Sequence, residues 1–445
     1  MTQPTPNGKS TPPGKPALRL LHASDLHLER PLYGLSEAPD HLLELLIDAP
    51  LRAAEQVFET ALAEDVDAVL LAGDVLEVDR AGPPGIMLLL EQFARLGDRD
   101  IPVYWAGGKV DLPDHWPRSV TLPANVHVFP IGHVETLNLV RAGDVVARVQ
   151  GTSCREDGAV DARGFHRDAH GMFTIGVAYA GAVGAQLSAI GRTDPPTADS
   201  RQPTALSDRV HYMALGGRHK YQTVDHQPGV ARFSGTPQGR CPTESGPHGC
   251  TLVHVDDTGR ARPQFVATDA VRWSNETLEV TATTKQEQLF ERLVERVEKL
   301  QAKHPNVDLL ITWNIHGTGP LVNRLRPNSL ADELLVDLRR RFGERPPFAW
   351  SVSLECSSPL SVPPEWFDQE TVLGDYLRQV RAFELDGRLP FDLQPFLADG
   401  VRDPELAAIA RVDGDAERAQ LINAAAKLGV DLLTIPIEEG DLRDE

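Results

Sequence analysis

The sequence predicts an α+β protein with a large share of β-sheet and a helical C-terminal region. Two observations lead to this prediction. Short apolar runs typical of buried strands alternate with helically spaced segments over roughly the first hundred residues. From about residue 126 the apolar runs are mostly strand-like, and helical spacing returns only near residue 284.

Three predicted strands in the first part of the chain each end in a polar turn. The strands cover residues 18–23, 67–72 and 102–105, and the turns after them contain Asp25 and His27, Asp74, and Asp111. Helical spacing predicts helices over 51–63 and near 85–96. Because α/β folds usually bind ligands at the carboxyl ends of their strands, we expect a site where these turns meet.

The rest of the chain is predicted as strands first and as a mixed unit afterwards. Strands are expected at 126–129, 134–140, 145–150, 173–178, 210–215, 230–233 and 251–255, with a loop at 193–201. A second unit begins near Trp273, and a capping box of Thr284 and Glu287 opens its first helix. Its elements are a helix at 284–301, a strand at 307–312, a helix at 329–342, a strand at 349–354, and helices at 369–383 and about 404–428.

We therefore predict four parts: a disordered tail over 1–17, a main domain over 18–272, a small α/β domain over 273–358, and a helical region over 359–445. The tail is rich in Pro, Gly, Ser and Thr and lacks the apolar segment of a signal peptide. The chain of 445 residues contains no run of about 18 apolar residues, so we expect no transmembrane helix. Its four scattered cysteines lack the spacing of a metal site or disulfide framework, and a reducing cytoplasm fits them best.

The charge balance limits the partners of the chain. Its 44 basic and 64 acidic side chains give a formal net charge of −20. This excess of negative charge excludes broad, non-specific attraction to nucleic acid. Any contact with DNA is therefore expected to be local, or assisted by metal ions or by a partner.

Polar motifs at the ends of three predicted strands form an ordered series. Asp25 and His27 follow the first strand, Gly73-Asp74 follows the second, and Gly216-Gly217-Arg218-His219 follows a later one. Carboxylate and imidazole groups together suit Mn, Fe or Zn. An Asp-x-His pair alone is more often a turn, but the whole series predicts a metal site.

With these motifs the chain resembles a known family over about residues 18–273. The stretches LHASDLHLERPL, LLAGDVLEVD, AGGKVD, HYMALGGRHK and FSGTPQGRCPTESGPHGCTLVHVD are similar to those of the calcineurin-like metallophosphoesterases, and among them to the bacterial SbcD/YhaO-type DNA-repair exonucleases. The resemblance implies a metallophosphoesterase-type β-sandwich flanked by helices, with a capping domain after it. It also implies a hydrolase that holds two metal ions about 3.5–4 Å apart.

The resemblance assigns one metal to Asp25, His27, Asp74 and His219, which are all of the expected types. At the positions of the ligands private to the second metal stand Lys109, Tyr179 and Gly217, and Val110 stands at the position of the leaving-group acid. We therefore predict a site for one divalent ion, with Mn²⁺ as the preferred candidate.

Lys109 has several interpretations. Its ammonium could replace part of the missing charge beside Asp74, which makes Asp25, Asp74 and Lys109 the candidate catalytic residues. It could also reach Asp74 and exclude metal, or face solvent while ligands come from another register. The alternative ligands are then Asp111, Asp114 or His115. Tyr179 is expected to be a packed aromatic residue at a sheet edge.

Three functions follow from this site. The first is an exonuclease-like phosphodiesterase of weak or lost activity, because a missing general acid typically costs about 10²–10⁴ in rate and a missing Lewis acid several kcal/mol more. The second is a pseudo-nuclease that scaffolds DNA ends or binds an SMC-type coiled-coil ATPase. The third is a phosphoesterase for a small substrate. The resemblance also implies homodimers.

Overall fold

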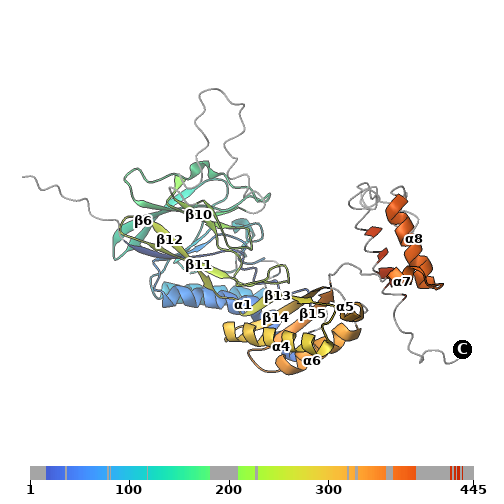
Figure 1. Ribbon diagram of the computed structural model, residues 1–445. Helices are drawn as coiled ribbons and strands as arrows, with labels where there is room; N and C mark the ends of the chain where they lie inside the picture. The colour runs from blue at the N-terminus through green and yellow to red at the C-terminus, as the bar shows by residue number, and fades with distance from the viewer. Residues whose placement is uncertain are drawn as a thin grey trace, which may run out of the picture. The chain divides into compact units, whose positions relative to one another are not determined.

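The computed structural model describes residues 17–35, 38–77, 80, 82–117, 119–180, 209–225, 229–317, 320–325, 329–356 and 364–386, with a few more between 421 and 433. The predicted tail up to residue 16, the predicted loop at 193–201 and most of the predicted helix at 404–428 lie outside these residues. The chain forms two units. The first comprises Met1–Asn275, Lys303–Ile311 and Pro346–Ala349; the second comprises Glu276–Ala302, Thr312–Arg345 and Trp350–Glu445 (Figure 1).

The first unit contains two six-stranded sheets. In one, the order is β12-β11-β1-β2-β3-β4, where β1 to β4 are parallel and β11 and β12 are antiparallel to their neighbours. Its strands are β1 (Leu18–Ala23), β2 (Ala68–Leu71), β3 (Val103–Trp105), β4 (Val126–Val128), β11 (Gly249–Val255) and β12 (Ala261–Ala267).

The other sheet has the order β5-β6-β7-β8-β10-β9, with β6, β7, β8 and β10 parallel. The edge strands β5 and β9 are antiparallel to β6 and β10. The strands are β5 (Glu135–Arg141), β6 (Asp144–Thr152), β7 (Phe173–Tyr179), β8 (Tyr212–Gly216), β9 (Gln222–Asp225) and β10 (Val230–Phe233).

The two sheets pack face to face around one apolar layer. Leu20 and Leu70 from the first sheet meet Phe173, Ile175 and Tyr212 from the second in a cluster of fully or nearly fully buried side chains. Along each strand every second side chain faces this layer, because successive residues of a strand point to opposite faces. Together with the helices on the outer face, this arrangement confirms the predicted α+β sandwich.

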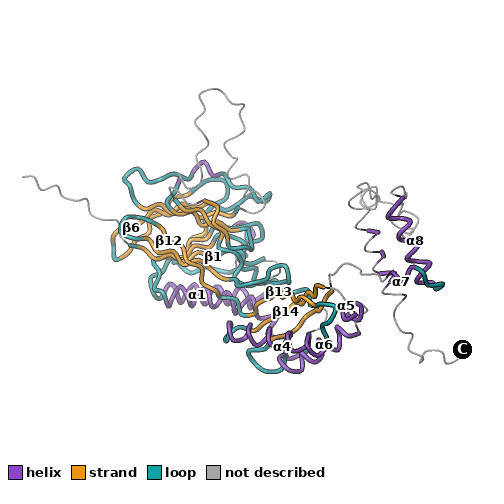
Figure 2. Tube along the Cα trace, viewed as in Figure 1, coloured by secondary structure: helices purple, strands orange, loops and turns teal. Residues whose placement is uncertain are grey.

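Two helices pack against the outer face of the first sheet, and Figure 2 labels the first of them, α1. They are α1 (Asp40–Ala63) and α2 (Gly82–Gly97), and the ring centroids of Phe58 on α1 and Phe93 on α2 are 5.8 Å apart. The predicted helix at 51–63 is only the second half of α1, because the helix runs through Pro50 and its earlier turns bury Leu42 and Leu46. The buried face thus continues across the proline that marked the predicted start.

The two sheets meet closely at the carboxyl ends of β2 and β8. A side chain at Gly216, the last residue of β8, would place its Cβ 1.8 Å from the carbonyl oxygen of Ala72, which follows β2. Only glycine permits this approach. As a result, the turns after β1, β2 and β3 lie against the end of β7 and the turn after β8, and side chains from both sheets can share one site.

The second unit contributes helices that flank a three-stranded sheet of order β13-β14-β15. The strands are β13 (Val271–Val280), β14 (Asp308–Gly317) and β15 (Ala349–Cys356). The helices beside this sheet are α4 (Gln286–Lys303), α5 (Pro320–Leu325) and α6 (Ser329–Phe342). The chain continues with α7 (Pro364–Phe367) and α8 (Val372–Asp386), which contact each other. The three-stranded sheet and its helices follow the predicted pattern of the small α/β domain. No helix among the described residues is long and apolar enough to cross a membrane.

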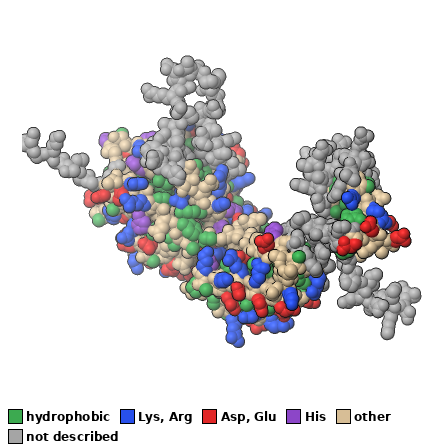
Figure 3. Space-filling model, viewed as in Figure 1, with side chains coloured by type: hydrophobic (Ala, Val, Ile, Leu, Met, Phe, Trp, Pro, Cys, Tyr) green, Lys and Arg blue, Asp and Glu red, His purple; other side chains and the backbone are tan. Residues whose placement is uncertain are grey.

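The arginine run near the end of α6 is engaged within the second unit. Arg339 donates to the carbonyl oxygens of Ser351 and Val352 at 2.8 and 3.0 Å, and its guanidinium lies over the Trp350 ring. The next two arginines form ion pairs with Asp337 and Glu298. On the visible face of this unit blue and red side chains are accordingly intermixed (Figure 3).

A buried histidine makes the stability of the first unit depend on pH. The His22 ring on β1 is enclosed, with Nδ1 2.9 Å from the Tyr212 hydroxyl and Nε2 3.2 Å from the Leu215 carbonyl oxygen. Burial lowers the pKa of His22 from 6.5 to about 3. Between these values the unfolded chain binds a proton that the folded chain does not, so stability is full above pH 6.5 and falls as the pH drops towards 3.

We predict that His22→Asn reduces this dependence. The free energy of unfolding of the wild type, measured by urea denaturation, should fall by up to about 1.4 kcal/mol per pH unit between pH 6 and pH 4. That of His22→Asn should fall less steeply. His115→Asn, at an exposed histidine, is the control and should keep the wild-type slope. Equal slopes for wild type and His22→Asn would contradict the prediction.

Candidate metal centre

Three residues of the site adopt backbone conformations that side chains normally avoid. Asp25, His27 and Asp74 have φ angles of 55°, 44° and 54°. The left-handed region costs a non-glycine residue roughly 1–2 kcal/mol, and such strain gathers at functional sites. Two main-chain hydrogen bonds lock the turns together, from Asp25 N–H to the Gly73 carbonyl at 2.9 Å and from His27 N–H to the Asp74 carbonyl at 3.1 Å.

The carboxylate of Asp25 is fully buried and held by donors from both sheets. The Gly217 N–H lies 3.1 and 3.0 Å from its two oxygens, and the Ser24 hydroxyl donates to it at 2.5 Å. Burial raises the pKa of Asp25, with a smaller contribution from the nearby charge of Asp74. A cation beside this group would oppose both effects, because an opposite charge favours the ionised carboxylate.

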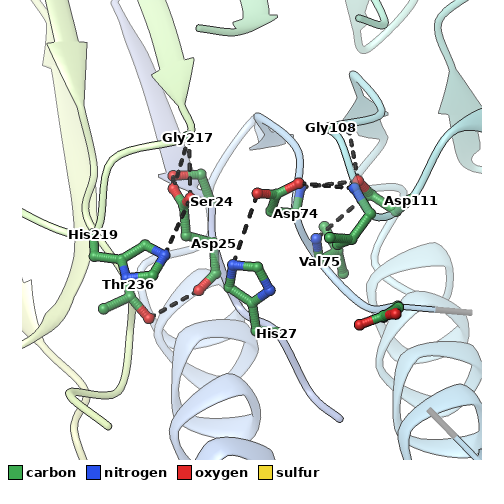
Figure 4. A network of polar contacts seen from close by, with 12 residues as sticks. Ser24, Asp25, His27, Asp74, Val75, Gly108, Asp111, Gly217, His219 and Thr236 are labelled. Atoms are coloured by element: carbon green, nitrogen blue, oxygen red, sulfur yellow. Dashed lines mark hydrogen bonds and ion pairs between the residues drawn. The ribbon is translucent and has the colours of Figure 1, made fainter. Parts of the chain in front are cut away.

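Each of the two histidines has a carboxylate beside its Nδ1, and Figure 4 shows the opposite ring nitrogens turned towards Asp74 and Asp25. His219 Nδ1 is 2.5 Å from Glu244 Oε1, and His27 Nδ1 is 3.5 Å from Glu29 Oε1. The opposite ring nitrogens face the aspartates: His27 Nε2 is 3.7 Å from Asp74 Oδ2, and His219 Nε2 is 4.0 Å from Asp25 Oδ1. Carboxylates placed in this way orient metal-binding histidines and make them stronger ligands.

These donors fit a metal ion. One ligand atom each from Asp25, His27 and His219 lies within 4.8 Å of the other two. Both ring nitrogens of His27 are buried without a hydrogen-bond partner, which is costly unless another group satisfies them. The side chain of His219 is 37% exposed, so the group opens to solvent on that side. The structure thus brings together the four residues of the predicted first-metal site.

Main-chain atoms and a phenol occupy the other side of Asp74. Its Oδ1 accepts a hydrogen bond of 3.1 Å from the Val110 N–H, and the charge of this carboxylate acts on the nearby phenol of Tyr179. Burial and the charges of Asp74 and Asp25 raise the pKa of Tyr179 well above its usual value, so the phenol stays protonated. Tyr179 is a buried residue at the end of β7, as expected, but it also faces the site.

The Lys109 side chain is exposed, and no ion pair joins it to Asp74 among the described residues. Its role as a substitute cation therefore stays a prediction. The donor that reaches Asp74 from this turn is the amide of the next residue, Val110.

The Asp111 carboxylate holds the turns after β2 and β3 together and is not free to bind a metal ion. One oxygen accepts from the N–H groups of Asp74 and Gly108 at 2.9 and 2.6 Å; the other accepts from Val75 N–H and the Trp105 indole at 3.1 and 2.8 Å. Burial and the charge of Asp74 raise its pKa to about 7. These four bonds commit the carboxylate, so the alternative register with Asp111 as a ligand is not the arrangement in the structure.

Three site residues were missed by the sequence analysis. They are Glu29 and Glu244, which contact the histidines, and Arg240, whose Nη2 lies 3.1 and 3.2 Å from the ring nitrogens of His219. Burial alone would raise the pKa of Glu244, but bonds from His219 and the Arg240 N–H outweigh it and lower the pKa to about 2. Glu29 follows His27 by two residues and could have been found by that spacing. Glu244 lies 25 residues beyond His219 and had no such signal.

Comparison with known proteins agrees with this geometry. The family profile described as "Calcineurin-like phosphoesterase" matches residues 18–168, which include Asp25, His27 and Asp74. The chain carries a calcineurin-like metallophosphoesterase domain. Proteins of this family are metal-dependent, and the donor group described above is where this metallophosphoesterase domain can bind an ion.

Two curated proteins are homologous to the chain. It is 27% identical to the "Uncharacterized metallophosphoesterase YhaO" of Bacillus subtilis over 341 residues, which cover 76% of this chain and 81% of that protein. It is 36% identical to the "DNA double-strand break repair protein Mre11" of Aeropyrum pernix over 95 residues, or 21% of each chain. A solved structure, that of TT1561 from Thermus thermophilus, aligns with 56% of this chain and 99% of its own at 10% identity and a TM-score of 0.30.

We predict that the carboxylates behind the histidines raise metal affinity. Glu244→Gln and Glu29→Gln remove the charge that orients each ring, so each should weaken Mn²⁺ binding by about 10- to 100-fold in isothermal titration calorimetry. Glu135→Gln is a matched control, because Glu135 lies 2.9 Å from His127 in a pair outside the site. An affinity unchanged in Glu244→Gln would show that this carboxylate has no part in metal binding.

Proposed function

We propose that this chain is a phosphodiester-directed metallophosphoesterase, related to DNA-repair exonucleases, that binds one divalent ion. The observation that carries the proposal is the pair of histidines, each with a carboxylate on Nδ1 and its other nitrogen turned towards Asp25 or Asp74. The homology with YhaO supports the metallophosphoesterase class, and the partial match to Mre11, a DNA double-strand break repair protein, favours nucleic acid as the substrate class.

The residues of the proposed site have different roles: some would bind the ion and others hold those ligands in place. Asp25, His27, Asp74 and His219 would hold the ion, with Mn²⁺ preferred for this mixed set of oxygen and nitrogen donors. When bound, such an ion polarises a phosphoryl oxygen and lowers the pKa of a coordinated water. Asp111 keeps the Asp74 turn in place, and the Gly217 N–H fixes the orientation of Asp25.

The proposed activity is weak. Position 110, a valine, offers only a main-chain N–H to Asp74, so no side chain there can protonate a leaving group. General acid catalysis typically contributes about 10²–10⁴ in rate. The Val110 amide already bonds to Asp74 Oδ1, and Tyr179, a poor metal ligand, stands where the family has a histidine, which supports a single ion per chain.

The same two residues, Val110 and Tyr179, favour a second candidate function, a pseudo-nuclease that binds DNA ends without cleaving them. Such a protein would keep the metal for structure or for gripping a phosphate. It would also keep surfaces for a partner, for which an SMC-type coiled-coil ATPase and a second copy of the chain are our candidates. Any DNA contact is local, since the chain carries a net charge of −20.

We predict one equivalent of Mn²⁺ per chain and slow, Mn²⁺-dependent cleavage of single-stranded DNA. Asp74→Asn removes a charged ligand while keeping the size of the side chain, so it should weaken metal binding at least about tenfold and abolish turnover. Asp98→Asn, at an exposed acid of the same unit, is the control. One bound ion without turnover in the wild type would favour the pseudo-nuclease, and no bound ion would refute both.

Restoring the missing groups provides a second test of the proposed function. The triple variant Lys109→Asn, Val110→His and Tyr179→His supplies a general acid and ligands, and turnover should rise by about 10²-fold or more with a second equivalent of Mn²⁺. Gly217 is left unchanged because its φ of 93° would strain a histidine. A triple variant that folds, by its melting temperature, yet binds only one ion would contradict the assignment of the second-metal side.

A further inference from the structure

A cavity of about 330 Å³ opens directly beside the metal centre. His219 and Glu244 form part of its wall, so one face of the proposed metal site is also a face of the cavity. The remaining wall comes from the segment after His219, the turn after β10 and the start of β11, and from Phe265 on β12.

The position of the cavity relative to His219 is fixed by the main chain. The N–H of Thr236, which lines the cavity, donates to the His219 carbonyl oxygen at 3.0 Å, and its hydroxyl donates to the carbonyl of Asp25 at 2.8 Å. Glu244 joins the opposite wall to the His219 ring. A group held in the cavity is therefore held at a set distance from the donors of the metal centre.

Two aromatic rings line the cavity. Tyr221 and Phe265 lie with centroids 4.8 Å apart and planes at 62°, and both are half-buried. The Arg232 guanidinium covers one face of Tyr221, 3.8 Å from the ring centroid. This side chain is nine-tenths buried and fixes the ring from behind. The two rings of a T-shaped pair do not cover each other face to face. Part of a ring face therefore stays available for stacking with a planar aromatic ligand.

The polar groups of the cavity wall suit an uncharged ligand group that is joined to a charged group outside the cavity. The hydroxyls of Thr243 and Ser245 face the cavity with the carboxylate of Glu244, which disfavours an anion inside it. At the rim, Lys220 is exposed and forms no ion pair among the described residues. A nucleoside, with its base and sugar uncharged and a phosphate at either end, matches this distribution.

We propose that this cavity is a nucleoside subsite, in which a base stacks on Tyr221 or Phe265 while the adjoining phosphate lies at the metal centre. The assignment rests on the proposed function for the position of that phosphate. It makes nucleic acid the substrate class, and places Lys220 at the next phosphate of the strand. Base stacking on aromatic side chains is tolerant of sequence, so the subsite selects nucleotides without reading their order.

The test compares two strands of equal length that differ only in their bases. Fluorescein-labelled hexathymidylate and a matching abasic strand are titrated with the Mn²⁺-loaded full chain, and Kd is read by fluorescence anisotropy. Phe265→Ala and Tyr221→Ala should raise the Kd for hexathymidylate by about fivefold to 150-fold and leave the abasic strand unchanged. Tyr221→Phe should restore binding, and Phe383→Ala, at an exposed aromatic of α8, is the matched control.

Two results would overturn the subsite. One is an unchanged Kd for hexathymidylate in both alanine variants that melt within a few degrees of wild type. The other is equal weakening of both strands, which would show that the cavity contacts the backbone alone. Lys220→Gln should weaken both strands alike. If the wild type fails to cleave but the base-dependent difference in Kd persists, the proposed activity fails and the subsite stands.

Discussion

The site depends on the approach of two sheets at their carboxyl ends. Because Gly216 has no side chain, β8 reaches the end of β2, and residues that follow β1, β2, β3 and β8 gather within one small volume. A single sheet would deliver Asp25, Asp74 and Asp111, but not His219. The metal centre is therefore a product of the sandwich, and the contacts of Gly217 and His219 with Asp25 require that the two sheets meet there.

Within the metal centre, the charges of the buried side chains are balanced by direct contacts. Buried carboxylates surround two imidazoles, and the main source of positive charge among the protein side chains near His219 is the buried Arg240. Hydrogen bonds to main-chain N–H groups stabilise Asp25 and Asp111, yet burial still raises the pKa of both. A divalent cation is the natural complement to such a cluster, since buried charges are tolerated only when paired or bound to metal.

The sequence predicted the strands and the meeting of the turns that hold Asp25, His27 and Asp74, because strand ends in a parallel sheet converge by rule. His219 lies on the other sheet, and only the motif series and the family resemblance pointed to it. It could not predict Glu244 or Arg240, since they approach His219 through a loop whose path depends on packing. It also focused on the side chain of Lys109, whereas the contact with Asp74 comes from the amide of Val110. Side-chain patterns carry no information about which main-chain donors a turn exposes.

The hydrogen bond from the Val110 amide to Asp74 affects which residues of this loop can change without a change of fold. The loop from Gly108 to Asp111 is fastened by two carboxylates, those of Asp74 and Asp111, and by amides that every residue except proline possesses. These hydrogen bonds do not depend on which side chains stand at 109 and 110. A hydrolase and an inert binding protein could share this backbone and be separated by point substitutions, with no remodelling of the scaffold between them.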